Sequence, residues 1–151
     1  MDAYIIGKVK FRNAKLGYVR VDDGSVIILR VAIIDVRLQD VISPFGVEFE
    51  VNVTTGITVY PSSNSLNEVK NKPTIEPGRI VKEGWVQVNI VEKASAHEEI
   101  VYNDKKVGTY LVRVEIEPIM VSKNLLYKTV HGVPWYIVRW VPKVAWSKIQ
   151  E

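Results

Sequence analysis

Cysteine is absent from this sequence of 151 residues, and that absence excludes several kinds of chemistry at once. Without cysteine there is no disulfide, no thiolate nucleophile and no sulfur ligand for a metal. Apolar runs never exceed four residues, whereas a helix that crosses a bilayer needs about 20. Glycine motifs that cradle phosphates or bind dinucleotides are also missing. We therefore expect no cofactor, no metal and no membrane association.

Only two histidines occur, His97 and His131, and neither stands in a pattern that binds a metal. The triplet His97-Glu98-Glu99 lacks the second histidine of a zinc-binding helix, and no cysteine can complete such a site. The nucleophile motif G-x-S-x-G is missing as well. These gaps favour a protein that binds rather than catalyses.

Residues branched at Cβ dominate what is present. Valine contributes 26 residues and isoleucine 16, against 6 alanines and 7 leucines. Branching at Cβ restricts χ1 and suits a pleated strand better than a helix. Turn residues separate the segments of strand character, which is typical of a sandwich or barrel. We expect a single all-β domain over residues 1–151, either an antiparallel β-barrel or a two-sheet β-sandwich, of about nine to ten strands.

The segment Ser25–Arg37, SVIILRVAIIDVR, is the centre of this prediction. It follows Asp23 and Gly24, which predict a tight hairpin with the preceding strand. Nine of its thirteen residues are apolar, which indicates a strand buried on both faces. At about 3.3 Å per residue it would span roughly 43 Å, so we expect it to bend or to pass between sheets. Arg30 marks the place for that bend, or else for a carboxylate partner from the set Asp35, Glu48 and Glu50.

Two later segments also predict local structure. Val47–Val53 alternates apolar and polar residues as a half-buried strand does, and Thr54-Thr55-Gly56 predicts a hairpin that returns the chain. Residues 61–78 hold three prolines, three serines and three asparagines, which predicts a long irregular loop. That loop is either functional or a crossover between two sheets, and it includes a helical turn capped by Ser65.

The formal net charge of +3 conceals an uneven distribution. Residues 3–21 hold five basic and no acidic residues, and residues 120–151 hold five basic residues and one acidic residue. Residues 22–119 hold ten basic and fifteen acidic residues. Either the basic ends meet the acidic middle within the fold, or they form a basic face for an anionic partner.

The segment from Lys128 to Lys148 is the strongest candidate for a binding surface, because it interleaves aromatic and basic residues. Aromatic faces stack on bases and cations neutralise phosphates, as in proteins that bind single-stranded nucleic acid. A basic row on the first strand would extend the surface. The alternative is that the tryptophans pack in the core or at a subunit interface while the basic residues are solvated. The candidate nucleic-acid-binding residues are Lys8, Lys10, Arg12, Lys128, Trp135, Tyr136, Arg139, Trp140, Lys143 and Trp146.

We therefore predict a non-enzymatic binding module whose favoured partner is nucleic acid or another polyanion. The first alternative is a structural or assembly protein that forms a homo-oligomer by self-association. The second is a carbohydrate-active enzyme, because alternate glutamates place paired carboxylates on one strand face. These pairs are Glu48 with Glu50 and Glu115 with Glu117.

Composition also predicts where the protein works. The absence of cysteine and of a signal-peptide pattern favours a cytoplasmic protein. Heavy use of Ile, Val, Lys and Glu with only three glutamines suits a thermophile.

Overall fold

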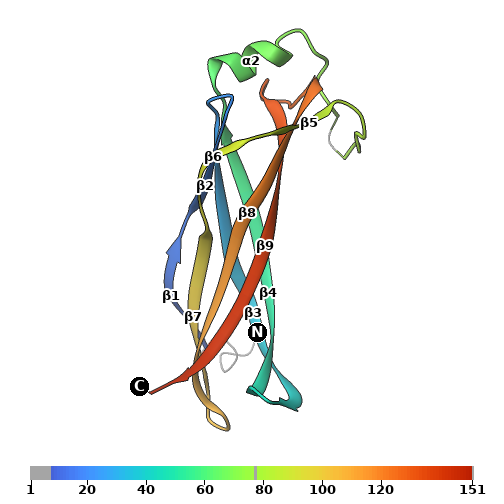
Figure 1. The fold of residues 1–151 in the computed structure, drawn as a ribbon. Coiled ribbons are helices and arrows are strands. Elements are labelled where there is room, and N and C mark those ends of the chain that lie inside the picture. Colours follow the sequence, from blue (N-terminus) through green and yellow to red (C-terminus); the bar gives the residue numbers. More distant parts are fainter. Residues whose placement is uncertain (1–7, 77, 151) are drawn as a thin grey trace.

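The structure is a computed structural model that describes residues 8–76 and 78–150, and most of this chain is β-strand (Figure 1). Strand accounts for 71% and helix for 5%, in two antiparallel sheets, which confirms the all-β prediction. Within the described residues, no helix is long and apolar enough to cross a membrane. The nine strands described are β1 (Val9–Lys15), β2 (Gly17–Val21), β3 (Val26–Ser43), β4 (Gly46–Tyr60), β5 (Trp85–Val88), β6 (Ile90–Ala94), β7 (Ala96–Asp104), β8 (Gly108–Lys128) and β9 (Pro134–Ile149).

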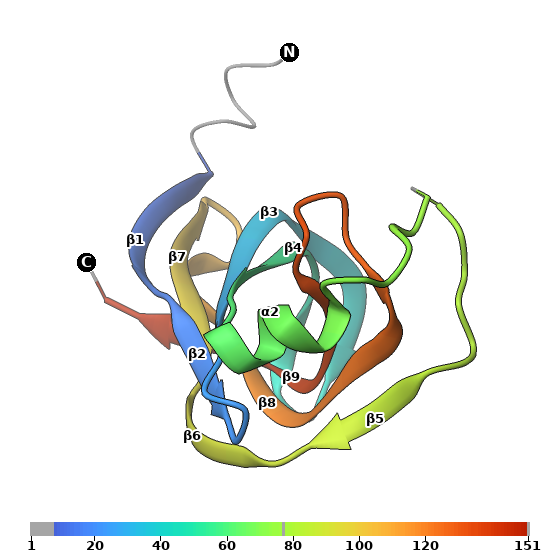
Figure 2. The same ribbon diagram turned by 90° about the horizontal axis from the view of Figure 1, so that it is seen from above.

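A short helix, α2 (Ser63–Val69), follows β4 and lies across one end of the two sheets (Figure 2). Its N-cap is Ser62, whose Oγ accepts a hydrogen bond from the Ser65 backbone at 3.1 Å. The prediction that Ser65 caps the helix is therefore wrong, because Ser65 lies one turn further in, with its side chain buried. The chain between β4 and β5 joins one sheet to the other, which confirms the crossover interpretation.

The two sheets are joined along one side by strands that pass from one sheet into the other. Sheet A has the order β1-β7-β8-β5, with β9 on the other side of β8, and sheet B has the order β4-β3-β2-β6. Only Leu16 separates β1 from β2, and only Ser95 separates β6 from β7. Because β1 pairs with β7 and β2 with β6, both pairs turn the corner together. A Cβ on Gly17 would lie 2.5 Å from the Ala96 nitrogen, so this close approach of backbones requires glycine.

The opposite side of the sandwich is open. Among the described strands, β4 pairs only with β3 and β9 pairs only with β8, so β4 and β9 are free edges. The described residues form no closed barrel, and of our two alternatives the structure is a sandwich. A hydrogen bond of 3.2 Å from Trp146 Nε1 to the Val47 carbonyl links β9 to β4 near one end.

β3 lies inside sheet B, but it does not have two buried faces. Arg30 is exposed on the face opposite the core. The register with β4 shifts between Ile33 and Asp35, and beyond that bulge the buried position moves to Val36. The prediction of burial on both faces is therefore wrong, because an extra residue in the bulge moves the apolar pattern to the other parity. The irregularity of the strand lies at Ile34, whereas the register at Arg30 is unbroken. Before the bulge, the fully buried side chains of β3 are Ile27, Leu29 and Val31.

β4 runs without interruption through the predicted hairpin at Thr54-Thr55-Gly56, so that prediction is wrong. Because β3 is 18 residues long, it offers hydrogen-bond partners along all of β4, which favours a continuing strand over a turn. Gly56 lies opposite Arg30 in this register. Arg30 has no ion pair with the predicted carboxylates in the described part of the chain, since Asp35 pairs with Arg37 at 2.8 Å.

Candidate interaction surface

The tryptophans of the C-terminal segment contact other parts of the same chain. Trp135 meets Trp85 edge to face, with ring centroids 5.5 Å apart. Trp146 meets Phe49 in the same way at 5.4 Å, and Trp140 packs against the larger apolar cluster of the interior. All three tryptophans are half-buried, so part of each ring is already in contact with the rest of the chain, as the alternative of packing within the fold predicts.

The basic residues of the same segment are largely engaged. Lys143 Nζ lies 2.9 Å from Glu117 and 3.6 Å from Glu115. Lys128 Nζ donates to the Lys70 carbonyl at 3.1 Å. Exposed Arg139 lies beside Met120, with a nitrogen 3.9 Å from the sulfur.

The predicted basic row lies far from the aromatic segment. Lys10 and Arg12 are exposed on β1, at one edge of sheet A, while β9 forms the other edge with β7 and β8 between them. Lys8 Nζ pairs with the buried carboxylate of Asp104 at 3.1 Å. The structure thus does not bring the candidate residues together into one surface, and nucleic-acid binding by them stays a prediction.

The carboxylate pair of β8 belongs to a row of ion pairs on the outer face of sheet A. Arg113 contacts Glu99 at 2.6 Å and Glu115 at 3.3 Å. Glu117 lies between Lys143 and Lys93, and these two ammonium groups lower its pKa. A glycosidase acid requires a raised pKa instead, so the arrangement around Glu117 suits a solvated ion-pair row.

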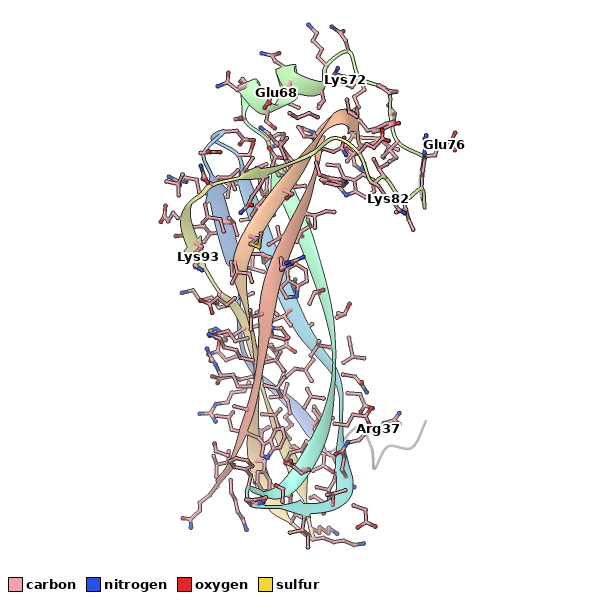
Figure 3. All side chains as sticks on the ribbon, turned by 45° about the vertical axis from the view of Figure 1, so that its right-hand side comes forward. Arg37, Glu68, Lys72, Glu76, Lys82 and Lys93 are labelled. Atoms are coloured by element: carbon pink, nitrogen blue, oxygen red, sulfur yellow. The ribbon has the colours of Figure 1, made fainter. Side chains whose placement is uncertain are left out.

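A polar network that no sequence pattern predicts lies beneath α2. Lys123 Nζ lies 3.0 Å from Asp23 Oδ2 and 2.6 Å from Glu68 Oε1. The Tyr136 hydroxyl donates to Asp23 and lies 2.6 Å from Ser65 Oγ. Figure 3 shows Glu68 on α2, at the end of the molecule that this network closes.

The charges of the network stabilise one another. Burial alone would raise the pKa of Asp23, but hydrogen bonds from Tyr136, the Ser25 backbone and Lys123 outweigh burial and lower it. Burial alone would lower the pKa of Lys123, but its hydrogen bonds to Glu68 and Asp23 outweigh burial and raise it. A buried lysine held as an ammonium ion is a poor nucleophile. The network therefore anchors α2 to the sheets.

The free edge of β4 is a second candidate surface, because among the described strands β4 pairs with β3 alone. From Val51 to Tyr60 it has no charged residue and no proline, and Val53 to Tyr60 pairs with β3 without a bulge. We call these ten residues the β4 edge segment. An exposed strand edge presents unpaired N–H and C=O groups to any added strand.

The other sheet edges have features that prevent the addition of a further strand. β1 carries three basic residues and a bulge, and β5 and β6 have only four and five residues. β9 is about as long as β4, but it contains two prolines, Pro134 and Pro142, and three basic residues, Arg139, Lys143 and Lys148. Charge, proline, bulges and short length all discourage strand addition. Among the described strands, the β4 edge segment alone lacks every one of them.

Inward-facing apolar side chains along the open side are incompletely covered. Val53 and Ile57 face the interior, because they pair with Ile33 and buried Leu29, yet they are 41% and 38% exposed. Val144 on β9 pairs with buried Val114 and is 46% exposed. A strand added to β4 would cover part of this apolar surface.

No family model matches the chain, and neither curated proteins nor solved structures gave a match. No group of three or more His, Asp or Glu side chains that could hold a metal ion occurs within residues 8–76 and 78–150. Fold and surface together define an all-β sandwich with one open side and one long unprotected edge.

Proposed function

We propose that this protein is a non-enzymatic structural or assembly protein that self-associates through the β4 edge segment. The observation that supports the proposal is the uncharged, proline-free edge, which contrasts with the protected edges elsewhere in both sheets. A cytoplasmic location and a thermophilic source stay predictions of the composition.

Strand addition at this edge would satisfy backbone groups and bury apolar surface together. In an antiparallel ladder every second residue pair exchanges two backbone hydrogen bonds, and side chains directly opposite one another contribute roughly 0.2–1 kcal/mol each. One strand edge covers less than the roughly 800 Å² per partner of a standard specific interface. We therefore expect association in the micromolar range, and assembly that depends on protein concentration.

Sedimentation equilibrium from about 1 µM to 1 mM tests the proposal. The unchanged protein should pass from monomer to oligomer within this range. A variant with Thr54→Lys and Thr58→Lys should stay monomeric, because both positions are exposed on the β4 edge segment. The matched control is Val141→Lys with Ala145→Lys, which places two lysines at the same spacing on the exposed part of β9 and should associate normally. A monomer at every concentration, or equal effects of the two double variants, would contradict the proposal.

Polyanion binding is a second candidate function, favoured by the exposed cations of β1. Lys10, Arg12 and Lys15 lie along one edge and are exposed, and none forms an ion pair with another described residue. Binding to single-stranded DNA or RNA should fall steeply with salt and should be lost in a variant with Lys10→Glu and Arg12→Glu. Binding that survives that variant unchanged would exclude this site.

A further inference from the structure

The β4 edge segment reads almost the same in both directions. Centred on Gly56, the residues from Val53 to Val59 run Val-Thr-Thr-Gly-Ile-Thr-Val. An isologous interface uses the same surface on both copies, so residue i contacts residue j and j contacts i. A sequence with this symmetry is suited to pairing with itself in the antiparallel direction.

We propose that two copies of the chain pair their β4 strands antiparallel about a two-fold axis at Gly56. This inference rests on the proposed function and specifies its partner and register. On the inner face the pairing places Val53 opposite Val59 of the partner subunit, each pair occurring twice. On the outer face it places Thr54 opposite the partner's Thr58, and Thr–Thr pairs are among the stabilising cross-strand pairs.

Charge and space both permit this pairing. The β4 edge segment has no charge, so no like charges meet directly across the axis. Gly56 is not at positive φ, and a Cβ there would meet nothing within 4 Å, so its surroundings leave room for a neighbouring strand. Arg30 lies opposite Gly56 on β3. The two Arg30 side chains would sit three strand spacings apart, about 14 Å, which exceeds the screening length of about 8 Å at physiological salt.

The geometry also predicts that assembly stops at two copies. Pairing at β4 joins two four-stranded sheets B into one sheet of both copies. The remaining edge of each sheet B is β6, which has five residues and carries Glu92 and Lys93. That edge is short and charged, so it does not extend the assembly. We therefore infer a closed dimer rather than a filament.

Cysteine crosslinking tests the direction and register, and the chain has no native cysteine to interfere. In the proposed register, positions 54 and 58 of opposite copies have Cα atoms about 4.5–5.5 Å apart, within the range that a disulfide spans. Identical positions, 54 with 54 or 58 with 58, lie about 14 Å apart along the strands and cannot be bridged. A mixture of the single variants Thr54→Cys and Thr58→Cys should therefore give a disulfide-linked dimer, while each variant alone should not.

The outcomes separate this inference from the proposed function. Crosslinking of Thr54→Cys alone would show either parallel pairing or an antiparallel pairing centred on residue 54, and either result would overturn the register while leaving self-association through β4 intact. The register would also be overturned if Thr54→Cys and Thr58→Cys both form dimers in sedimentation but give no disulfide, either alone or when mixed. A protein that stays monomeric in sedimentation removes the proposed function and this inference together. A second test of contact between the two β4 strands uses charge. The double variant with Thr54→Lys and Thr58→Lys should form a dimer when it is mixed with the double variant that carries glutamate at both positions, although neither variant dimerises alone.

Discussion

The two ends of the sandwich are closed by opposite kinds of chemistry. Beneath α2, Lys123 and Asp23 form a buried ion pair that Tyr136 joins through its hydroxyl. At the other end, Phe49 is surrounded edge to face by three aromatic rings, with centroids 5.0–5.4 Å apart. These rings are Tyr102, Tyr110 and Trp146.

The difference has consequences for stability. Ring contacts do not depend on the charge of any group, so the part of the stability that comes from the rings around Phe49 should be the same at every pH. Acid sensitivity at this end comes instead from buried Asp104, which accepts a hydrogen bond from Tyr102 at 3.5 Å. The end beneath α2 depends on charges that fix the helix in one position, and a broken pair there leaves an uncompensated charge. Substitutions at the two ends should therefore differ in their pH dependence and in whether a second substitution rescues them.

The largest expected effect is at the aromatic end. Phe49→Ala should lower the free energy of unfolding by about 4 kcal/mol, because it leaves a cavity and removes three ring contacts. Urea unfolding at pH 7 measures this loss. The control Phe49→Leu fills most of the cavity and should cost clearly less. A loss below about 1 kcal/mol for the alanine variant would mean that the three rings do not pack closely around Phe49.

Removal of Lys123 should have the next largest effect. Lys123→Met should cost about 3 kcal/mol, because it leaves the carboxylate of Asp23 buried without its cation. Adding Asp23→Asn should recover a substantial part of the loss, since the second change removes the stranded charge. Chemical unfolding of the two single variants and the double variant measures the coupling. Simple additivity of the two losses would argue against a charge pair.

This network could not be predicted from the sequence, whereas parts of the fold could. The predicted pairing of the strands on either side of Asp23 and Gly24 is confirmed, because the signal for a tight turn lies in adjacent residues. Only Gly24 has a positive φ, of 90°, and the Val21 nitrogen donates to the Ser25 carbonyl, so the loop has three residues rather than the expected two. Lys123 meets Asp23 across 100 positions of chain. Nothing near either residue marks the other as its partner, so only the folded topology could reveal the pair.

The candidate surface on β4 likewise combines features that adjacent residues encode with features that depend on distant contacts. The local pattern correctly predicted the alternation of Val47–Val53. It wrongly predicted a hairpin at Thr54-Thr55-Gly56, because glycine is common in turns. β4 is continuous because β3 pairs with it over its whole length. The sequence pattern predicted that the strand before it ends at Arg37, whereas β3 continues to Ser43. Which strands become free edges is a property of sheet order, and sheet order follows from contacts between distant segments.

A smaller effect is expected from the hydroxyl of Tyr136. Tyr136→Phe keeps the ring but removes the group that bonds Asp23 and Ser65, so it should cost about 1–2 kcal/mol. Thermal unfolding at pH 7 measures the loss. The control is Tyr110→Phe at the aromatic end, a half-buried side chain whose ring contact with Phe49 the change preserves. An equal loss in both variants would show that the Tyr136 hydroxyl has no special role.

The finest comparison is between the pH profiles of the two ends. The pKa of Asp23 is lowered on folding, so its contribution to stability is complete above the unfolded value of about 3.9 and is lost as the pH falls through the folded pKa. The pKa values of Lys123 and Tyr136 are raised on folding, so their contributions are complete below about pH 10 and are lost as the pH rises through the folded values.

Unfolding free energies between pH 2 and pH 7 should therefore converge for the unchanged protein and Asp23→Asn as the pH falls, because the aspartate is protonated and its advantage disappears. Asp104 near the other end also has a lowered pKa, through hydrogen bonds from the Lys106 backbone and from Lys8, but it titrates alike in both proteins. Trp146→Phe at the aromatic end should instead give a profile parallel to that of the unchanged protein. If the Asp23→Asn profile were also parallel, the carboxylate would not be responsible for the acid sensitivity of the α2 end, and the contrast between the two ends would reduce to packing alone.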